Sequence, residues 1–434
     1  MMLQLYKSVS GASGPLFRAL LSARARDGKE APAHMGERLG KASLERPAAP
    51  VVWIHAASVG ESQSALILVE RLIALIPAAR ILMTTGTVSS AGMIRKKLPE
   101  GAIHQFYPVD HPAWVKEFLD HWRPDLVLWM ESELWPNMLT DIARRGIPAI
   151  LVNARLSEKS FARWSWIRGT AKEILGAFSL ILSQSEKEAE RFRALRAKNV
   201  HATGNIKYSA RPLPFDDNDL KTITGAIGQR PVWLYASSHK GEEALACRVH
   251  QKLKAQFPEL LTIIVPRHPE RRDEIAETCR QAGLSFLLRG AAKTPPAYET
   301  DIYIADTFGE LGLFYRLAPL ACIGRSFSDD GGGGHNPIEA AQLNCAVLYG
   351  PHVQFQQTLF EDLSNSGGAL GVTDERELGN IISSLLSDPQ KMTAMQQRGL
   401  EFARSQSKIV DATIELISPY LDFSSDKMRG RACR

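Results

Sequence analysis

The sequence predicts an α/β protein of two domains, each built on a parallel β-sheet with helices on both faces. Three observations favour this class. Short apolar runs alternate with runs of helical periodicity along nearly the whole chain, which is typical of parallel sheets buried on both sides. A segment rich in proline and acid near residue 212 interrupts the alternation, which then restarts. The length of 434 residues exceeds what one ordinary core supports, so two or three domains are expected.

The first half contains apolar runs with the length of buried strands. They are Val51–His55, Arg80–Thr84, Ile103–Val109, Leu126–Met130, Ala149–Asn153 and Leu180–Ser183. Helical patterns lie between them, for example over Glu61–Ile76, Pro112–Trp122 and Trp135–Arg145. The helix over 61–76 has the clearest pattern, because Ala65, Leu68, Val69 and Leu72 recur at the spacing of one buried helix face.

A linker is predicted over Arg211–Asp219, where prolines and acids cluster. It contains Asp217-x-Asp219, which resembles a metal-binding pair, but in a linker we expect solvated acids. Strand-like runs then resume at Val232–Ala236, Leu261–Val265, Ile302–Ala305, Leu320–Ile323 and Ala346–Tyr349. Helices are expected over Glu242–Phe257, Arg271–Ala282, Gly309–Leu317 and Ile338–Leu343, and from Glu375 to Tyr420.

Composition places the chain among soluble globular proteins, with 44% hydrophobic and 23% charged residues. The five cysteines are scattered, without C-x-x-C, so neither a zinc ribbon nor a disulfide framework is predicted, and a reducing compartment fits. The net charge of +5 permits an acidic ligand or membrane surface and does not call for nucleic acid. Walker A, G-x-S-x-G and post-strand G-x-G-x-x-G motifs are missing, which argues against P-loop ATP hydrolysis, an α/β-hydrolase and a standard NAD site.

The N-terminal segment, residues 1–45, begins with a basic and apolar stretch. Its first 26 residues carry lysine and arginine but no acid, together with many apolar side chains. No apolar run approaches the ~20 residues that a spanning helix needs. The pattern favours a segment that lies on an anionic membrane face. The alternative is a first helix docked on the protein itself.

The turn after the first predicted strand places a carboxylate where ligands bind in open α/β sheets. Ser58-Val59-Gly60-Glu61 joins the strand over 51–55 to the helix over 61–76. Glu61 is a candidate general base if its surroundings are apolar enough to raise its pKa. The alternative is that Glu61 only interacts with the helix dipole.

In the second half, Gly331-Gly332-Gly333-Gly334-His335-Asn336-Pro337-Ile338-Glu339 follows a strand and opens a helix. Glycines let a backbone approach a ligand, and free N–H groups at a helix start favour a phosphate. Glu339 is placed to hydrogen-bond ribose hydroxyls. The alternative is a flexible loop before a capped helix.

Three more strand-to-helix turns support a nucleotide site in the second half. They are Val265–Arg271, Asp306-Thr307-Phe308-Gly309-Glu310 and Ser237–Glu242. Arg267, at the end of its strand, is suited to bind a phosphate or carboxylate bidentately, although a surface salt bridge is the equally ordinary reading.

Two further features of the first half are candidates for sugar chemistry. Trp129-Met130-Glu131-Ser132-Glu133-Leu134-Trp135 places two carboxylates near two tryptophans, which suits positioning a sugar and stabilising developing positive charge; helix capping and core packing are the alternatives. Lys207, in Gly204-Asn205-Ile206-Lys207, is suited to neutralise an anionic leaving group, although a lone lysine is usually solvated.

Taken in chain order, these blocks resemble the 3-deoxy-D-manno-oct-2-ulosonic acid (Kdo) transferases of lipopolysaccharide synthesis. The matching blocks are Gly36-Glu37-Arg38, Ser58–Glu61, Glu131–Asn137, Asn153–Ser157, Gly204–Lys207, Gly241-Glu242-Glu243, Val265–Arg271, Gly309-Glu310-Leu311 and His335–Ala341. The chain departs from the family where Gly324-Arg325-Ser326 replaces a common Gly-Gly-Ser, and where the loop from Ser326 to His335 is slightly long.

The resemblance implies a GT-B glycosyltransferase, in which two Rossmann-like domains face a central cleft. It implies inverting transfer of Kdo from CMP-Kdo to a lipid A precursor, without a metal or other cofactor. In this resemblance Glu61 is the catalytic base, and Glu131 and Lys207 stabilise the transition state. The donor contacts implied are Pro266, Arg267, Phe308, Gly309, Glu310, Asn336, Pro337, Ile338 and Glu339.

These inferences combine into one expected organisation. Residues 1–45 associate with the membrane, residues 46–212 bind the acceptor, and residues 213–434 bind the CMP-sugar and include the C-terminal helices. The protein is then expected on the cytoplasmic face of the inner membrane, either peripheral or anchored by its N-terminus. Two alternatives stay open: a nucleotide-sugar epimerase of the same scaffold, and a non-enzymatic protein that binds a sugar lipid.

Overall fold

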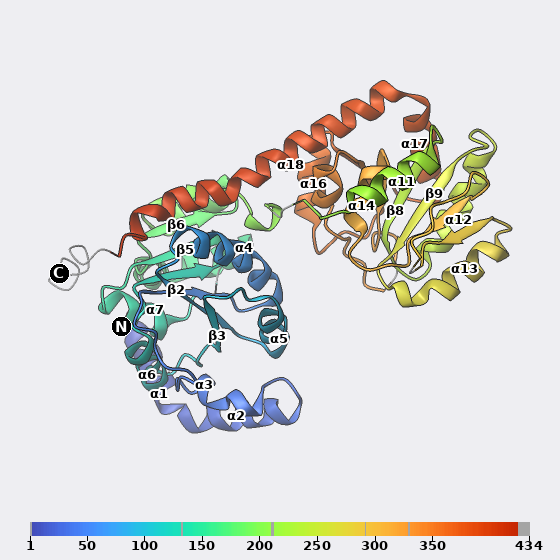
Figure 1. Ribbon diagram of the computed structural model, residues 1–434. Coiled ribbons are helices and arrows are strands. Elements are labelled where there is room, and N and C mark those ends of the chain that lie inside the picture. The colour runs from blue at the N-terminus through green and yellow to red at the C-terminus, as the bar shows by residue number, and fades with distance from the viewer. Residues whose placement is uncertain (1, 132, 210–211, 291, 329, 424–434) are drawn as a thin grey trace. The chain divides into compact units, whose positions relative to one another are not determined.

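The computed structural model describes residues 2–131, 133–209, 212–290, 292–328 and 330–423. Its contacts divide the chain into two compact units, each of which carries one seven-stranded parallel sheet (Figure 1). The first unit comprises the described residues up to Ser209 and those from Lys408 onward, and the second comprises those between. The prediction of two α/β sheets with parallel strands is confirmed.

The first sheet has the strand order β3-β2-β1-β4-β5-β6-β7. Its strands are β1 (Val51–His55), β2 (Arg80–Thr85), β3 (Ala102–Phe106), β4 (Leu126–Met130), β5 (Ala149–Ala154), β6 (Leu180–Ser183) and β7 (Val200–Ala202). Central β1 pairs with both β2 and β4, so that Ile54 lies opposite Met83 and Leu128. The order reverses between β1 and β4, and ligands of such sheets bind at the carboxyl ends of the strands at this switch point.

The second sheet has the related order β10-β11-β9-β8-β12-β13-β14, in which β11 lies between β9 and β10. Its strands are β8 (Val232–Ser238), β9 (Leu261–Pro266), β10 (Phe286–Leu288), β11 (Ile302–Ile304), β12 (Leu320–Ile323), β13 (Ala346–Tyr349) and β14 (Ala369–Gly371). Here the order reverses between β8 and β12, which pair in parallel with Cys322 opposite Tyr235. The turns that follow these two strands are therefore the expected ligand-binding turns of the second unit.

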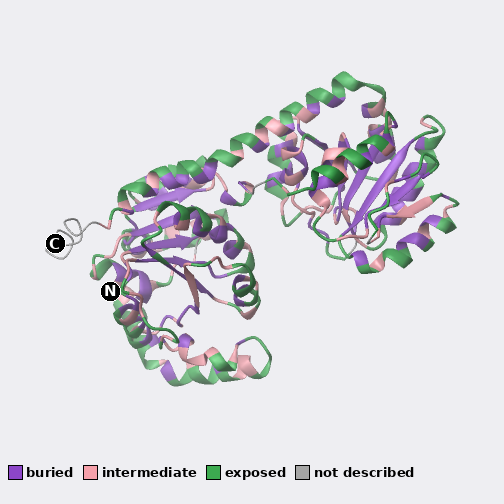
Figure 2. Cartoon of the chain, in the orientation of Figure 1, coloured by how far each residue is buried: buried purple, intermediate pink, exposed green. Residues whose placement is uncertain are grey.

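Helices cover both faces of the first sheet because alternate strand residues point to opposite sides. Trp53, Val127 and Leu151 pack under one group of helices; that group is α6 (Pro112–Trp122), α7 (Pro136–Arg144), α9 (Arg168–Leu175) and α10 (Glu186–Ala194). Ile54 and Leu128 face the other group, which includes α4 (Val59–Leu75) and α5 (Val88–Lys97). Figure 2 shows the strands as the buried centre of each unit.

The second sheet is covered in the same way. One face packs under α12 (Glu242–Lys254), α13 (Arg272–Gln281) and α17 (Glu375–Ser387). The other helices of this unit include α11 (Asp217–Ile227), α14 (Leu311–Leu317), α15 (Ile338–Gln342) and α16 (Gln357–Asn365). The cysteines at 247, 279, 322 and 345 are buried and free, and Cys433 lies outside the described residues.

The predicted linker is shorter than expected. Asp216 accepts hydrogen bonds from the backbone N–H groups of Asn218 and Asp219, at 2.8 and 3.0 Å, and so caps α11. Asp219 is consequently helical, and its carboxylate pairs with Arg289 and Lys293. The expectation of solvated acids there was wrong for Asp219, because a buried arginine elsewhere in the unit needs a partner. The linker residue Arg211 lies outside the described residues.

The long helix α18 (Pro389–Ile417) belongs to both units. Met392 and Met395 join the core of the second unit. From Lys408 onward the chain belongs to the first unit, where Ile409, Ile414 and Ile417 pack on the same core as α4. The sequence pattern predicts this stretch as part of the second domain, whereas its apolar face from Lys408 onward completes the cover of the first sheet.

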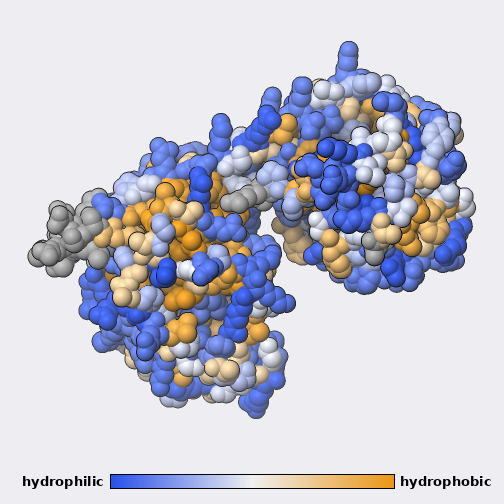
Figure 3. Space-filling view, in the orientation of Figure 1, coloured by the Kyte–Doolittle hydropathy of each residue, from blue (hydrophilic) through white to orange (hydrophobic). Residues whose placement is uncertain are grey.

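The N-terminal segment begins with two helices, α1 (Met2–Ala12) and α2 (Gly14–Arg26), and the short α3 (Met35–Arg38) follows them. One side of α1 is docked on the first unit: the Tyr6 hydroxyl donates to Asp110 at 3.0 Å, and Asn137 donates to the Ser10 hydroxyl at 2.9 Å. The other side leaves apolar residues exposed, and Figure 3 shows apolar and hydrophilic residues next to one another over this end of the unit. Among the described residues, none of the helices combines the length and the apolar content needed to cross a bilayer.

Candidate active site

Glu61 lies in the first turn of α4, directly after the switch-point strand β1. The Ser58 side chain caps this helix by accepting from the Glu61 N–H. The Glu61 carboxylate accepts hydrogen bonds from the Ala57 N–H and the Ser58 hydroxyl, both at 2.9 Å. The side chain is held in one place by these contacts, and the residue is only 8% exposed.

The surroundings of Glu61 favour its protonated form. Burial is the largest cause and raises the pKa of the carboxyl group above its ordinary value, and the negative charges of Glu131 and Glu133 add to this effect. The hydrogen bonds from Ala57 and Ser58 oppose it. A raised pKa is what a general base near neutral pH requires, so the electrostatic condition set by the sequence analysis is met.

Glu131 follows β4, the other strand at the switch point. Its backbone N–H bonds to the Val152 carbonyl at 3.0 Å, and its φ of 55° is left-handed, an unusual conformation for a residue with a side chain. Lys207 approaches from a short 3₁₀ helix, Ile206–Tyr208. The Lys207 Nζ lies 2.8 Å from a carboxylate oxygen of Glu131. Strained residues of this kind concentrate at functional sites.

Two asparagines hold Lys207 in this position. The Asn205 side chain accepts from the Lys207 N–H at 3.1 Å, and the Asn153 side chain accepts from the Ile206 N–H at 3.0 Å. A Cβ atom added to Gly60 would lie 3.5 Å from the Lys207 Nζ, so the ammonium group reaches the first turn of α4. The structure thus brings Glu61, Glu131 and Lys207 together at one edge of one sheet.

The two tryptophans of this region differ in their roles. Trp129 is fully buried, and its indole N–H donates to the Glu133 carbonyl at 2.6 Å. Trp135 is exposed and donates to the Glu133 carboxylate at 3.0 Å. Trp135 and Glu133 are therefore available at the surface for a sugar, whereas Trp129 is a core residue.

The predicted donor residues follow three strands of the second sheet. Pro266 ends β9 and is buried, and the exposed Arg267 after it makes no ion pair with a described residue. Phe308, after β11, is 77% exposed, and Gly309 has a left-handed φ of 79°. Exposed Arg267 and Phe308 offer a cation and an aromatic face to a ligand.

Glu310 differs from the other predicted donor residues because its carboxylate is bound within the protein. Arg289 is fully buried and donates to both carboxylate oxygens of Glu310, at 2.7 and 2.9 Å. Burial would raise the pKa of Glu310, but hydrogen bonds from Arg289, Thr307 and Lys293 bring it to about 2. Sequence reasoning missed this arrangement, because Arg289 lies on another strand turn and carries no local motif.

The loop and helix after β12 place the remaining predicted residues. The Asn336 side chain accepts from the Ile338 N–H at 3.1 Å and contacts Glu339 at 3.4 Å, while Pro337 and Ile338 are buried. Burial raises the pKa of Glu339, and the positive charge of Arg267 opposes the shift. Arg267 follows β9 and Glu339 follows β12, so both residues lie after the carboxyl ends of strands of the second sheet.

Packing explains the four consecutive glycines at positions 331–334, and the sequence pattern did not predict this explanation. Each has a positive φ. Added Cβ atoms would overlap His352 at Gly332, Phe355 at Gly333 and Phe360 at Gly334, at 2.6, 2.0 and 2.8 Å. The run is thus needed for close packing against the segment 352–360, and only Gly331 faces open space.

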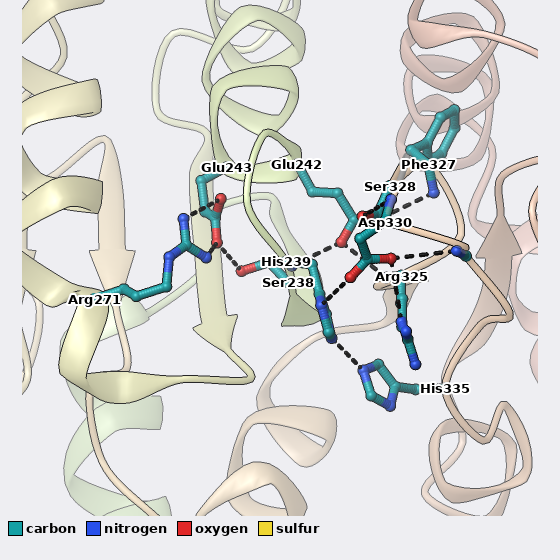
Figure 4. Close-up of polar contacts among 11 residues, drawn as sticks. Ser238, His239, Glu242, Glu243, Arg271, Arg325, Phe327, Ser328, Asp330 and His335 are labelled. Carbon is teal, nitrogen blue, oxygen red and sulfur yellow. Dashed lines mark hydrogen bonds and ion pairs between the residues drawn. The ribbon is translucent and has the colours of Figure 1, made fainter.

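A cavity of about 730 Å³ opens beside the loop that contains these glycines. The sequence pattern did not predict that the residues lining it form one site. Its walls include His239, Lys240, Glu242, Arg271, Phe327 and Asp330. Figure 4 shows that the buried Glu243 joins Arg271 to Ser238 on one side, while His239 reaches His335 on the other. The cavity therefore borders the loop that carries Asn336 and Glu339.

Comparison with known proteins identifies the family. Residues 33–210 match the family described as 3-Deoxy-D-manno-octulosonic-acid transferase (kdotransferase). The 3-deoxy-D-manno-octulosonic acid transferase of Rickettsia bellii (strain RML369-C) is 34% identical over 421 residues, which cover 96% of this chain and all of the relative (100%). The chain belongs to the Kdo transferase family. It is a glycosyltransferase, as the resemblance implied.

Solved structures with similar folds include enzymes of nucleotide sugars. The UDP-GlcNAc 2-epimerase of Neisseria meningitidis bound to UDP-GlcNAc aligns with a TM-score of 0.53 and 12% identity, over 84% of this chain and 100% of that one. The C-terminal CMP-Kdo binding domain of WaaA from Acinetobacter baumannii is 27% identical, with a TM-score of 0.40 over 43% of this chain and 98% of that domain. The fold is GT-B-like. By its sequence, the chain belongs to the Kdo transferase family rather than to the epimerases.

Proposed function

We propose that this Kdo transferase moves Kdo from CMP-Kdo to a lipid A precursor, with the acceptor bound by the first unit and the donor by the second. The observation that carries the proposal is the cluster of Glu61, Glu131 and Lys207 at the switch point of the first sheet. It combines a base of raised pKa, a second carboxylate and a cation. These are the groups that glycosyl transfer to a hydroxyl requires.

In the proposed reaction, an acceptor hydroxyl oxygen forms a bond to the anomeric carbon of Kdo. The bond from that carbon to the CMP phosphate oxygen breaks, and CMP leaves with the electron pair. Glu61 takes the hydroxyl proton. Glu131 stabilises the positive charge that builds on the sugar, and Lys207 stabilises the negative charge that moves to the phosphate. Attack on the face opposite the leaving group inverts the anomeric centre.

The donor contacts in this proposal are the turns after β9, β11 and β12. Arg267 meets the phosphate, Phe308 and Gly309 pack on the nucleotide, and Glu339 with the Asn336–Ile338 turn binds the ribose. Pro266 shapes the turn at the end of β9. Glu310 acts through its position in the turn, since its carboxylate is occupied by Arg289.

The proposal is tested by measuring CMP release from CMP-Kdo with and without a lipid A precursor. Release that depends on the lipid, with Kdo appearing on it, supports the transferase. Turnover of a nucleotide sugar without lipid would instead identify an epimerase, and binding without CMP release would identify a sugar-lipid binding protein.

We also propose that the reaction needs no metal. The described residues include no group of three or more His, Cys, Asp and Glu side chains arranged to hold an ion, and CMP as a monophosphate leaving group is within reach of protein cations alone. Prolonged treatment with EDTA should leave the rate of CMP release unchanged. A loss that Mg²⁺ restores would contradict this.

Finally, we propose that the protein acts at the cytoplasmic face of the inner membrane. The support is the basic, acid-free N-terminal stretch and the apolar side chains that α1 and α2 leave exposed. Such a surface suits an anionic bilayer that presents a lipid acceptor.

A further inference from the structure

The switch point of the second sheet carries an arginine and a histidine that no role above uses. His239 follows β8, and Arg325 follows β12, so the two residues stand on the adjacent strands between which the strand order reverses. Arg325 has a left-handed φ of 60°, and Ser237 before His239 has a φ of 58°. Both turns are thus held in a conformation that side-chain-bearing residues adopt at a cost.

One buried carboxylate holds both turns in place. Glu242, which is 2% exposed, accepts hydrogen bonds from the backbone N–H groups of His239 and Arg325, each at 2.8 Å. It also accepts from the Phe327 N–H at 2.9 Å. These three bonds fix the backbone from which His239 and Arg325 project, so the position of the two side chains is preorganised.

The space between the two side chains is occupied by a carboxylate of the protein itself. Asp330 accepts from Arg325 Nε at 3.3 Å and from the Gly332 N–H at 3.2 Å through one oxygen, and from His239 Nδ1 at 3.1 Å through the other (Figure 4). A guanidinium, an imidazole and a backbone amide that converge on one carboxylate make the pattern of an anion receptor. The Asp330 side chain is 44% exposed, so it can leave without opening the core.

A second histidine lies beside this receptor. His335 Nε2 lies 3.0 Å from His239 Nε2. Because His239 donates to Asp330 through Nδ1, the Nε2 atom of the neutral His239 ring is an acceptor, and His335 donates to it. Burial is the main cause that lowers the pKa of His335, to about 4, and the charges of Arg267 and Arg325 contribute. The receptor opens into the cavity of about 730 Å³ that His239 and Asp330 line.

We propose that His239, Arg325 and the Gly332 amide form an anion subsite that takes a carboxylate or phosphate of the donor, and that Asp330 fills this subsite until the donor displaces it. This inference rests on the proposed function for the identity of the ligand. The loop from Ser326 to His335, which is slightly long for the family, then contributes to donor affinity. Arg325, at a position where the family commonly has glycine, contributes as well.

Two substitutions test the subsite without disturbing the backbone. Arg325→Gly removes the guanidinium and keeps a residue for which a positive φ costs nothing. Asp330→Asn removes the competing charge and keeps an oxygen that can accept from Gly332. In titration calorimetry on the full-length protein, R325G should raise the Kd for CMP-Kdo about tenfold or more. D330N should lower it about threefold or more, and should have no such effect in the R325G background.

Ligand arms identify the anion that binds. CMP carries the phosphate alone, CMP-Kdo carries phosphate and carboxylate, and cytidine carries neither. Equal losses with CMP and CMP-Kdo in R325G assign the subsite to the phosphate, whereas a loss confined to CMP-Kdo assigns it to the carboxylate. Cytidine should be insensitive to both variants. Glu401→Gln, which removes a charge from an exposed helix position of the same unit, is the matched control and should change none of the affinities.

The proposal is overturned if R325G leaves the Kd of CMP-Kdo and CMP within about twofold of the wild-type values, or if D330N weakens binding. If the wild-type protein binds no cytidine ligand at all, the proposed function fails separately, and titration with inorganic phosphate decides the subsite. Tighter phosphate binding by D330N than by the wild type and R325G would uphold it. Equal binding by all three would rule it out.

Discussion

At the scale of single residues, Glu61 is the position on which the proposed chemistry depends most. Glu61→Gln keeps the shape of the side chain, and the amide can still accept from the Ala57 N–H and donate to the Ser58 hydroxyl oxygen. We expect kcat for CMP release to fall about 10²–10⁴-fold, the usual contribution of a general base, with the Kd for CMP unchanged. In the wild type, kcat/KM should rise with pH through a pKa above the ordinary glutamate value, because only the ionised form accepts a proton.

Stability measurements separate this loss from unfolding. The pKa of Glu61 is raised in the folded state, so its contribution to stability is present below the unfolded pKa and is lost as pH rises through the folded pKa. Glutamine does not titrate. Urea denaturation should therefore show E61Q gaining on the wild type as pH rises from the ordinary glutamate pKa through the raised pKa of Glu61. Glu70→Gln, at an exposed position on the same helix, should change neither activity nor this balance.

Lys207 allows a similar separation of activity from stability. Its side chain is 39% exposed where it pairs with Glu131, and pairs of this kind contribute at most about 1 kcal/mol. Lys207→Met should thus shift the Tm little, yet lower kcat by about 10²–10³-fold, because a cation is lost where negative charge develops. Lys172→Met, in an exposed turn of α9, is the control. Near-normal kcat in K207M would remove Lys207 from the mechanism.

The positions of several candidate residues could be predicted from the sequence because strand-to-helix turns are recognisable. Glu61 and Glu131 lie at the ends of β1 and β4, where the apolar runs placed them. What could not be predicted was which partners their neighbours take. Glu310 pairs with Arg289, which is distant in sequence, and the receptor of His239 and Arg325 depends on left-handed backbone that no residue pattern encodes.

At the scale of elements, the turn that delivers Lys207 depends on Gly204. Its φ is 101°, and an added Cβ atom would lie 2.4 Å from Ile409 Cδ1 on α18. A side chain in this conformation costs about 1–2 kcal/mol, and the overlap adds to it. We expect Gly204→Ala to lower the free energy of unfolding by at least about 2 kcal/mol in urea denaturation, and to lower kcat as the adjacent Asn205 and Lys207 shift.

The companion substitutions test the stated cause. Ile409→Ala in the G204A background removes the overlapping methyl groups, so it should recover part of the kcat that G204A loses. Gly225→Ala, in the interior of α11 with open space around the added atom, should instead stabilise the protein by about 0.5–1 kcal/mol. If G204A proved as harmless as G225A, α18 would not constrain this turn.

For the whole molecule, the alternation of apolar runs and helical patterns was sufficient to predict two parallel sheets. The alternation works because each buried strand must be apolar on both faces. Short edge strands such as β7, β10 and β14 have only three residues each and gave no such signal. The path of α18 was also not predictable, because an amphipathic helix shows that it covers a core without showing which core.

The features that support the proposed membrane binding lie on the N-terminal helices. In α1 and α2, Leu5, Val9, Leu16 and Leu20 are 63, 58, 67 and 54% exposed, respectively, beside a basic stretch without acids. Apolar burial and attraction to anionic lipid should act together there. Replacing Leu16 and Leu20 with serine should weaken binding to vesicles of anionic phospholipid by about tenfold or more, measured by cosedimentation. Binding to neutral phosphatidylcholine vesicles should be weak in both proteins.

If the N-terminal helices only pack on the first unit, the vesicle experiment should give a different result. Because α1 is tied to the first unit by Tyr6 and Ser10, the exposed leucines of α2 can change without releasing that contact. Leu75→Ser, at another exposed leucine of the first unit, should leave vesicle binding intact. If L16S/L20S and L75S bound anionic vesicles equally well, the N-terminal helices would serve only as cover for the first unit. If only L16S/L20S loses binding, and added salt weakens the binding of the wild type, these helices attach the protein to anionic membrane surfaces.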